Sequence, residues 1–323
     1  MSARGTVLRS YGPGQPLKAE QTEFVAGPGE TLIEMQVAAV SQLDRTVLAG
    51  KFAQQHQPPF VPGSEGAGVV TSSAVHPAGT RAVIRGGGVG VSRSGTWGTL
   101  AVVPDGSVHP VPDDLELTAA AGMLAPALTA HTAVRRVAGL VEGEVVVVTG
   151  VTGLLGRLAA AIARSAGAMR VIGLVLPGEP VELVEGLVDQ VVRVDELGQP
   201  GRDLPWCNAV IDTVGGPITS GVMGHISPGG RLVVLGYTAG EFATLDLHQL
   251  IGRDLRVLPV NMQRTSIDAA TVAQVLADIA TAPLRPDLQL IAANRAEDAL
   301  ELLARGGDRR VLLDVTRIGD LAG

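Results

Sequence analysis

Three glycines lie three residues apart in the stretch VVVVTGVTGLLGRLAAA, which runs from Val145 to Ala161. The valine run is typical of a buried strand, and the alanine-rich run after the glycines is typical of a helix. Where a strand turns into a helix, the free backbone N–H groups and the helix dipole favour a phosphate. Gly150 then permits the tight turn, Gly153 lets the backbone approach the ligand, and Gly156 lets the helix lie close to the strand.

The pattern predicts a dinucleotide site in which the N–H groups of Leu154 and Leu155 face the phosphates, the alternative being a tight turn that binds nothing. A carboxylate ending the second strand would bind the ribose of NAD, whereas a nearby basic residue favours NADP. That strand ends at Leu176 without a carboxylate, and Glu179 beyond it is more typical of a solvated loop charge. Arg193, at the end of the third strand, can reach a 2′-phosphate, although a surface arginine is the commoner outcome. The expected cofactor is NADP, with NAD as the alternative.

The glycine turn belongs to a segment in which strand and helix patterns alternate. Apolar runs without alternation are typical of parallel strands that helices cover on both faces. The pattern therefore predicts an α/β fold with a doubly wound parallel sheet of the dinucleotide-binding type. The stretch SPGGR, Ser227–Arg231, is expected to be a turn between a helix and a strand. The expected strands are residues 145–149, 171–176, 191–194, 209–212, 231–235 and 255–260.

The N-terminal third of the chain has a different residue pattern. Residues 1–110 contain short strand patterns between frequent Gly and Pro residues, which favours a barrel or a sandwich. From residue 115 an alanine-rich segment is expected to form a helix that breaks near Pro126. The strand pattern RRVLLDV, residues 309–315, is expected to return to this first domain.

Composition narrows the possible partners. The 323 residues are enough for two domains, and the net charge of −7 argues against a nucleic-acid partner. Cys207 is the only cysteine, so no internal disulfide forms and a reducing, cytoplasmic location is expected. The N-terminus carries no secretory pattern, and no apolar run approaches about 20 residues, so no membrane partner is expected.

Several motifs, in order along nearly the whole chain, resemble the zinc-independent quinone oxidoreductase branch of the medium-chain dehydrogenase/reductases. They are PPFVPGSEGAGVV (58–70), GTWGTLAVVP (95–104), LTA (128–130), DTVGG (212–216) and VVLGY (233–237). The resemblance implies a GroES-like β-barrel domain and a Rossmann domain, with the cofactor in the cleft between them. The implied GroES-like substrate domain comprises residues 1–122 and 263–323, and the implied Rossmann domain comprises residues 123–262.

The resemblance also bears on a metal. In zinc-dependent relatives a cysteine and a histidine stand at the positions that correspond here to Ser41 and Ser64. Glu65 remains, but zinc needs about three or four ligands and one carboxylate cannot hold it. We expect no metal.

The catalytic groups implied by the resemblance are only partly present. The tyrosine that can donate a proton in enoyl reductase relatives corresponds to Thr46, a poor acid that can still hydrogen-bond a carbonyl. Thr46 is the catalytic candidate on this basis. The family's arginine corresponds to Leu48, and no lysine for a 2′-phosphate is found near Pro180. Asp44 persists and is expected to bond backbone turns.

The remaining expected contacts come from the resemblance and from the sheet. The LTA element makes Thr129 a nicotinamide contact, and His131 is expected to pack within its helix. Ligands of open α/β sheets lie at the carboxyl ends of the strands. The cofactor contacts expected there are Thr213, Val214, Gly236 and Tyr237. The expected substrate contacts are Ser41, Thr46, Tyr237 and Asn261.

The sequence thus predicts an NAD(P)H-dependent oxidoreductase, without zinc, that transfers hydride to a small quinone or α,β-unsaturated carbonyl compound. The low aromatic content, 2%, slightly favours an enone over a quinone. A non-redox cyclase or isomerase on the same scaffold is the first alternative, and a structural protein that binds NADP for stability is the second. The sixth strand would be a sheet edge, so we expect a homodimer formed there.

Overall fold

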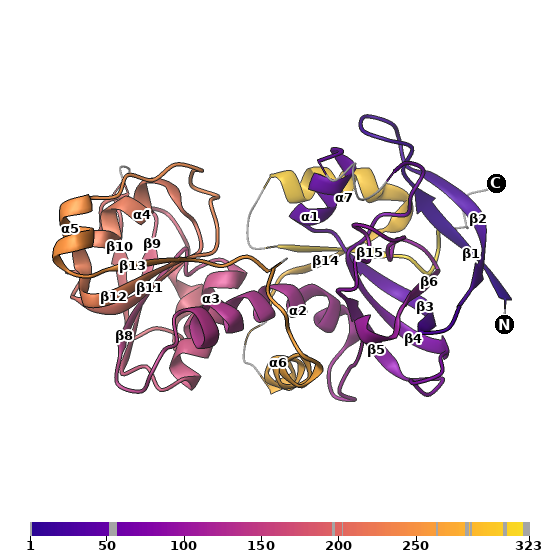
Figure 1. Cartoon of the computed structure of the whole chain (residues 1–323). Helices are drawn as coiled ribbons and strands as arrows, with labels where there is room; N and C mark the ends of the chain where they lie inside the picture. The colour runs from indigo at the N-terminus through magenta and orange to yellow at the C-terminus, as the bar shows by residue number, and fades with distance from the viewer. Residues whose placement is uncertain are drawn as a thin grey trace. The chain divides into compact units, whose positions relative to one another are not determined.

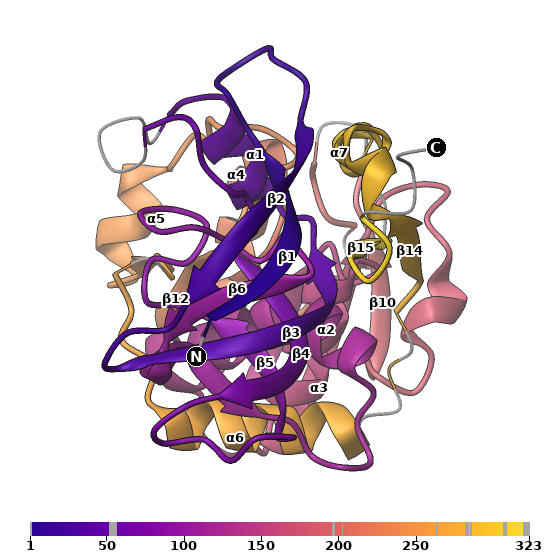
Figure 2. The ribbon, with the colours of Figure 1, turned by 90° about the vertical axis from the view of Figure 1, so that its right-hand side faces the viewer.

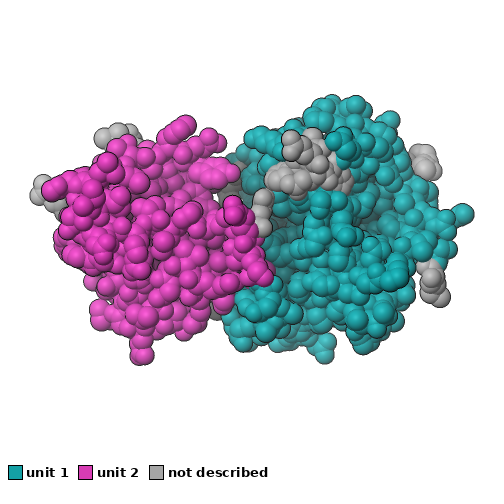
Figure 3. All heavy atoms as spheres, viewed as in Figure 1, with its two compact units in different colours: residues 1–124, 267–323 teal, residues 125–266 magenta. Residues whose placement is uncertain are grey.

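The computed structural model describes residues 2–51, 57–195, 198–201, 203–262, 264–281, 284, 286–305 and 309–318. The chain divides into two compact units (Figure 3). Unit 1 comprises residues 1–124 and 267–323, and unit 2 comprises residues 125–266. From the sequence, the two domain boundaries are expected directly after residue 122 and directly after residue 262.

Unit 1 consists mainly of antiparallel strands (Figure 1). Its strands are β1 (Ser2–Arg9), β2 (Lys18–Val25), β3 (Glu30–Ala39), β4 (Glu65–Ser72), β5 (Arg81–Arg85), β6 (Leu100–Pro104), β7 (Val108–Pro110), β14 (Leu288–Ala292) and β15 (Arg310–Asp314). Its α-helices are α1 (Gln42–Leu48), α6 (Ala269–Thr281) and α7 (Ala296–Ala304). Short 3₁₀ helices cover Asp105–Ser107 and Ala293–Arg295.

The strands of unit 1 form a two-stranded ribbon, β1–β2, and a seven-stranded sheet. The sheet order is β14-β15-β3-β4-β5-β7, and β6 pairs with β3. Strand β15 runs antiparallel to β3 with Leu312 opposite Ala39, and α7 packs beside β14 and β15 (Figure 2). The prediction that the C-terminal strand returns to the first domain is therefore confirmed.

The core of unit 1 fills the space enclosed by these strands. Trp97 is fully buried among aliphatic side chains such as Ile33 and Val103. Its indole N–H donates to the carbonyl oxygen of Ala39 at 3.2 Å, so its polar atom is satisfied.

Unit 2 contains the predicted doubly wound sheet. Its strands are β8 (Val145–Thr149), β9 (Arg170–Val175), β10 (Gln190–Arg193), β11 (Cys207–Asp212), β12 (Ile226–Val234) and β13 (Arg256–Pro259). Its helices are α3 (Leu154–Ser165), α4 (Gly216–Val222) and α5 (Leu247–Gly252), with 3₁₀ helices at Val181–Val184 and Met223–His225. All pairings are parallel, in the order β10-β9-β8-β11-β12-β13. This is the dinucleotide-binding order, which reverses direction between β8 and β11.

Strand β12 begins earlier than expected. Residues 227–230, predicted to form a turn, belong to β12. A register shift between Cys207 and Ala209 of β11 accommodates this stretch, and Gly229 supplies a φ of +75°. The register pairs Cys207 with Ile226 and Ala209 with Arg231, so residues 227–230 form a bulge between two paired residues of β12.

Helix α2 (Leu117–His131) crosses the boundary between the units in the chain and continues into a π-helical turn, Thr132–Val137. It does not break at Pro126, contrary to the prediction. A proline leaves the carbonyl four residues earlier without its helical donor. Here the Gly122 carbonyl oxygen accepts instead from Arg310 Nε at 2.8 Å. By length and composition, the helix Leu117–Val137 could cross a membrane. However, 67% of its most apolar stretch is buried inside the protein, which is typical of a core helix.

A bidentate ion pair ties the amino ends of the sheet in unit 2. Arg231 Nη1 and Nη2 donate to Glu144 Oε1 and Oε2 at 2.7 and 2.6 Å. Hydrogen bonding from Arg231 lowers the pKa of Glu144 below its ordinary value of 4.5. A depressed carboxyl pKa contributes stability that is present above the unfolded-state pKa and is lost as pH falls through the folded-state pKa.

We predict that Glu144→Gln lowers the free energy of unfolding by about 1.5–3 kcal/mol at pH 7, because charge-assisted bonds are lost. The difference from wild type should shrink as pH falls below the unfolded-state pKa of about 4.5 and on through the lower folded-state pKa. Urea unfolding from pH 7 down to the lowest pH at which the wild type remains folded measures both effects. Glu142→Gln, at an exposed position two residues away, is the control and should be neutral. A penalty for Glu144→Gln that is independent of pH would contradict the assignment.

Candidate functional site

The turn after β8 lies directly against the turn after β11. Gly150 has a φ of +56°, a conformation that glycine adopts without strain. A Cβ built at Gly150 would lie 2.4 Å from Val214 Cγ1 and 2.8 Å from Thr213 Oγ1. Position 150 therefore requires glycine for both its conformation and its close packing.

The other two glycines of the motif play different roles. A Cβ at Gly156 would lie 2.3 Å from the carbonyl oxygen of Gly150, so α3 can approach the turn only without a side chain there. A Cβ at Gly153 would meet only that same oxygen, at 3.4 Å. The backbone at 153 is thus open to an approaching group.

The start of α3 leaves donors for that group. The N–H of Arg157 bonds the carbonyl of the N-cap residue Gly153 at 2.9 Å. The earlier N–H groups of the first turn, including those of Leu154 and Leu155, have no intrahelical acceptor. The Leu154 side chain is buried and Leu155 is half-buried. A phosphate is the group that fits this turn, because it can accept from these N–H groups at the positive end of the helix dipole.

A buried carboxylate positions the turn after β11. Asp212 ends that strand with no exposed surface. Its Oδ1 accepts from Thr149 Oγ1 at 2.7 Å and from the backbone N–H groups of Val214 and Gly215 at 3.1 and 3.0 Å. Its Oδ2 accepts from Thr219 Oγ1 at 2.5 Å. The carboxylate therefore joins β8, the turn and α4.

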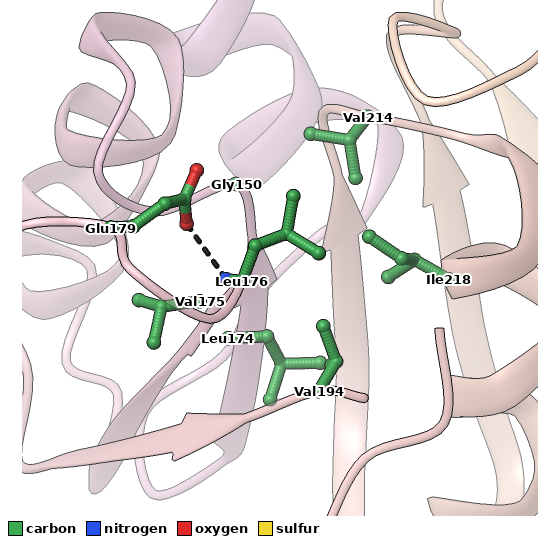
Figure 4. A pocket seen from close by; sticks show the side chains of 8 residues that line it. All are labelled: Gly150, Leu174, Val175, Leu176, Glu179, Val194, Val214 and Ile218. Atoms are coloured by element: carbon green, nitrogen blue, oxygen red, sulfur yellow. Dashed lines mark hydrogen bonds between the residues drawn. The ribbon is translucent and has the colours of Figure 1, made fainter. Parts of the chain in front are cut away.

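A small pocket opens beside the glycine turn (Figure 4). Its walls come from the carboxyl ends of β8, β9, β10 and β11 and from α4. The lining residues are Gly150, Leu174, Val175, Leu176, Glu179, Val194, Val214 and Ile218. Glu179 is the one charged member of this set. Its Oε2 accepts from the N–H of Leu176 at 2.8 Å, so the carboxylate is held at the end of β9.

The structure brings together part of the predicted cofactor set. Thr213 lies against β8, where its N–H and hydroxyl bond Thr149 at 3.0 and 2.8 Å. A Cβ at Gly236 would lie 2.1 Å from the Thr213 carbonyl oxygen, so the turns after β11 and β12 also touch. Tyr237 follows in that turn with 69% of its surface exposed in the structure.

Three other predicted contacts lie elsewhere in unit 2. Arg193 is exposed on β10 and does not line the pocket. The Thr129 hydroxyl donates within α2, to Ala125 O at 2.8 Å. The carbonyl oxygen of Asn261 accepts from Arg264 N and from the Thr265 hydroxyl.

The predicted residues of unit 1 gather at the start of α1. Ser41 is the N-cap, and its hydroxyl lies 3.4 Å from that of Ser64. Asp44 Oδ2 accepts from the Ser41 hydroxyl at 2.6 Å, and Oδ1 accepts from Ser64 N at 2.8 Å. Burial raises the pKa of Asp44, opposed by these hydrogen bonds. Asp44 thus bonds backbone turns, as predicted.

The Thr46 hydroxyl has a local acceptor. It donates to the carbonyl oxygen of Gln42, four residues earlier in α1, at 2.8 Å. A threonine bonded in this way presents its oxygen lone pairs rather than its proton. Proton donation by Thr46 would first require this bond to break.

Metal-binding groups are sparse in the ranges described above. In those ranges no three His, Cys, Asp or Glu side chains come together as a metal site. Glu65, which follows Ser64, is ion-paired with Arg85. Zinc independence stays a prediction from the residues at 41 and 64.

Sequence reasoning missed two residues that shape this site. Asp212 was recognised only as part of the DTVGG motif, although an acid that ends the buried strand CNAVID was a usable signal. Glu179 was assigned to a solvated loop, because the hydrogen bond that folds it back to Leu176 is not visible in sequence.

We predict that Gly156→Ala lowers the free energy of unfolding by about 1–3 kcal/mol, since the new methyl group overpacks the turn against Gly150. Thermal or urea unfolding of the purified protein measures this effect. Gly252→Ala is the matched control, because a Cβ there meets nothing within 4 Å. Equal stability of the two variants would show that α3 does not depend on this close approach.

Residues 27–113 match the alcohol dehydrogenase GroES-like domain family. The chain is 25% identical over 300 residues to the mitochondrial enoyl-acyl-carrier-protein reductase of Xenopus tropicalis, which covers 86% of this chain and 84% of that protein. It is 25% identical over 248 residues to the quinone oxidoreductase of Lama guanicoe, which covers 72% of each.

The fold matches that of a mycobacterial quinone oxidoreductase, with a TM-score of 0.79 at 21% identity over 96% of this chain and 99% of that one. The predicted combination of a GroES-like domain and a Rossmann sheet is confirmed. Residues 27–113 thus match a GroES-like domain family, and over most of its length the chain is similar to proteins named enoyl reductase and quinone oxidoreductase.

Proposed function

We propose that this protein is an NAD(P)H-dependent reductase that transfers hydride to a small quinone or enone without using zinc. The observation that carries the proposal is the turn after β8. Gly150 and Gly156 are closed against their neighbours, whereas Gly153 and the first N–H groups of α3 are open. A turn that served only to change direction would not need an open middle glycine.

The bound nicotinamide would supply the hydride, and the chain would supply position and a water-poor site. The N–H groups of Leu154 and Leu155 would hold the pyrophosphate. Side chains and backbone at Thr213, Val214, Gly236 and Tyr237 would line the cofactor at the carboxyl edge of the sheet, and Thr129 would contact the nicotinamide. Asp212 would act indirectly, since it fixes the turn that carries Thr213 and Val214.

The substrate class draws on the relatives. One is named an enoyl reductase and another a quinone oxidoreductase, and both names denote reduction of an electron-poor carbon–carbon or quinone system. Ser41, Thr46, Tyr237 and Asn261 are the proposed substrate contacts. Because the Thr46 proton is bonded to Gln42, we propose that Thr46 positions the substrate and that water delivers the proton.

The proposal also covers metal and location. Ser41 and Ser64 hydroxyls, bonded to Asp44 or to each other, are poor zinc ligands compared with thiolate and imidazole. Cys207 is buried and free, which suits the reducing cytoplasm.

We predict that the purified protein binds a reduced nicotinamide nucleotide and oxidises it in the presence of quinones or enones, followed as loss of absorbance at 340 nm. Thr46→Val should lower kcat/KM several-fold and leave nucleotide affinity unchanged, while Thr129→Val should weaken nucleotide binding. Thr118→Val, at the start of α2, is the control. Binding without turnover on either substrate class would favour the cyclase or isomerase alternative. The bond from the Thr46 hydroxyl to Gln42, which withholds its proton, is compatible with that alternative as well.

We further propose a homodimer formed through β13, which is the last strand in the sheet order. Val257 of β13 is exposed, and α5, the helix that precedes β13 in the chain, exposes Leu247 and Ile251. An uncovered strand edge flanked by apolar side chains favours pairing with a second copy.

Sedimentation at micromolar concentration should therefore show a dimer, and Val257→Lys should shift it toward monomer. Val75→Lys, at a valine of unit 1 that is 62% exposed, is the control and should leave the dimer intact. A wild-type protein that sediments only as a monomer would contradict this interface.

A further inference from the structure

We infer that Glu179 selects the cofactor: its carboxylate accepts hydrogen bonds from the ribose hydroxyls of the adenosine half and makes the site specific for NAD(H) over NADP(H). The inference rests on the proposed function, namely that the turn after β8 binds a dinucleotide. It reverses the preference for NADP expected from the sequence.

Glu179 takes the place of the carboxylate that is missing from the end of β9. That strand ends at Val175, and the chain then turns so that Glu179 N donates to Leu176 O at 3.2 Å. In return Leu176 N donates to Glu179 Oε2 at 2.8 Å. This reciprocal pair fixes the carboxylate at the end of β9 although Glu179 lies four residues beyond Val175 in the chain. Figure 4 shows the second carboxylate oxygen directed away from Leu176.

The side chains around Glu179 are mostly aliphatic. Glu179 and Gly150 both line one small pocket, so the carboxylate lies in the same pocket as the glycine turn. Its other walls are aliphatic: Leu174, Val175, Leu176, Val194, Val214 and Ile218. A flat, weakly polar base packs well against such side chains, while a few placed polar groups fix its orientation. Ribose hydroxyls are donors, and the one charged group that lines this pocket is an acceptor.

A 2′-phosphate would meet the wrong charge. From residue 171 to residue 192 the sequence contains no Lys, Arg or His, but it contains Glu179, Glu182, Glu185 and Asp189. Placing a doubly charged phosphate beside a held carboxylate is unfavourable, because like charges repel and no cation in this segment compensates.

Arg193, the first basic residue beyond that segment, does not offset the negative charge around Glu179. Val192 and Val194 on either side of it are buried, and Val194 lines the pocket. Because side chains alternate along a strand, Arg193 points away from the side to which Val194 contributes. Its exposure on β10 agrees with that direction.

The test is calorimetric titration of the full chain with NADH, NADPH, ADP-ribose and 2′-phospho-ADP-ribose, which requires no turnover. We expect the wild type to bind each nucleotide that lacks the 2′-phosphate at least about ten-fold more tightly than its phosphorylated counterpart. Glu179→Gln keeps an oxygen that can accept from Leu176 N but removes the charge. It should bring the two affinities to within about three-fold, and added salt should weaken the wild-type preference.

Glu182→Gln is the matched control, because Glu182 is an exposed acid of the same segment that does not line the pocket. Its preference should equal that of the wild type. A wild type that binds NADPH as tightly as NADH would overturn the inference and leave the proposed function standing. An equal shift in Glu182→Gln would also overturn it, because the general charge of the segment would then be responsible. Failure of all four compounds to bind would overturn the proposed function as well.

Discussion

The carboxylate of Asp212 is the interaction on which the geometry of unit 2 depends. A charge without exposed surface is strongly unfavourable unless donors surround it. Here two hydroxyls and two backbone N–H groups provide them, and they come from β8, from the turn after β11 and from α4. With that turn fixed, Thr213 and Val214 crowd position 150, and only glycine fits there. The close approach of α3 at Gly156 follows, and so does the exposed start of that helix.

A similar interaction between a carboxylate and nearby backbone N–H occurs at the end of β9. Glu179 bonds the N–H of Leu176, much as Asp212 bonds the N–H groups that follow it. In each case an acid folds onto nearby backbone and stiffens the loop at the carboxyl edge of the sheet. The two acids differ in exposure, because Asp212 is fully buried whereas Glu179 is only half-buried and keeps one oxygen directed away from its donor. Asp212 is therefore suited to hold the loop, and Glu179 is suited to meet a ligand.

Local sequence patterns predicted most of this architecture. The features that were predicted wrongly depend on contacts between residues far apart in the chain. Uninterrupted apolar runs predicted the six parallel strands and the glycine spacing predicted the turn after β8, because both patterns are local in the sequence. The crowding of Gly150 by Thr213 and Val214 is a long-range contact that the sequence does not show. The continuation of α2 through Pro126 depends on Arg310, which lies 188 residues after its acceptor Gly122 in the chain. The early start of β12 depends on a bulge opposite Cys207. The role of Glu179 was missed for a related reason. Glu179 follows β9 rather than ending it, and only the folded turn brings its carboxylate back to the end of that strand.

The pairing of β15 with β3 has a consequence for synthesis of the chain. Strand β3 spans residues 30–39, but its neighbour in the sheet spans residues 310–314 and is synthesised only after unit 2. Residues 125–266 emerge complete well before that point. Since domains fold as units during translation, the Rossmann unit can form while the N-terminal sheet still has an open edge at β3. A chain whose synthesis stops between residues 266 and 310 would therefore have one complete unit and one sheet with an unpaired, aggregation-prone edge at β3.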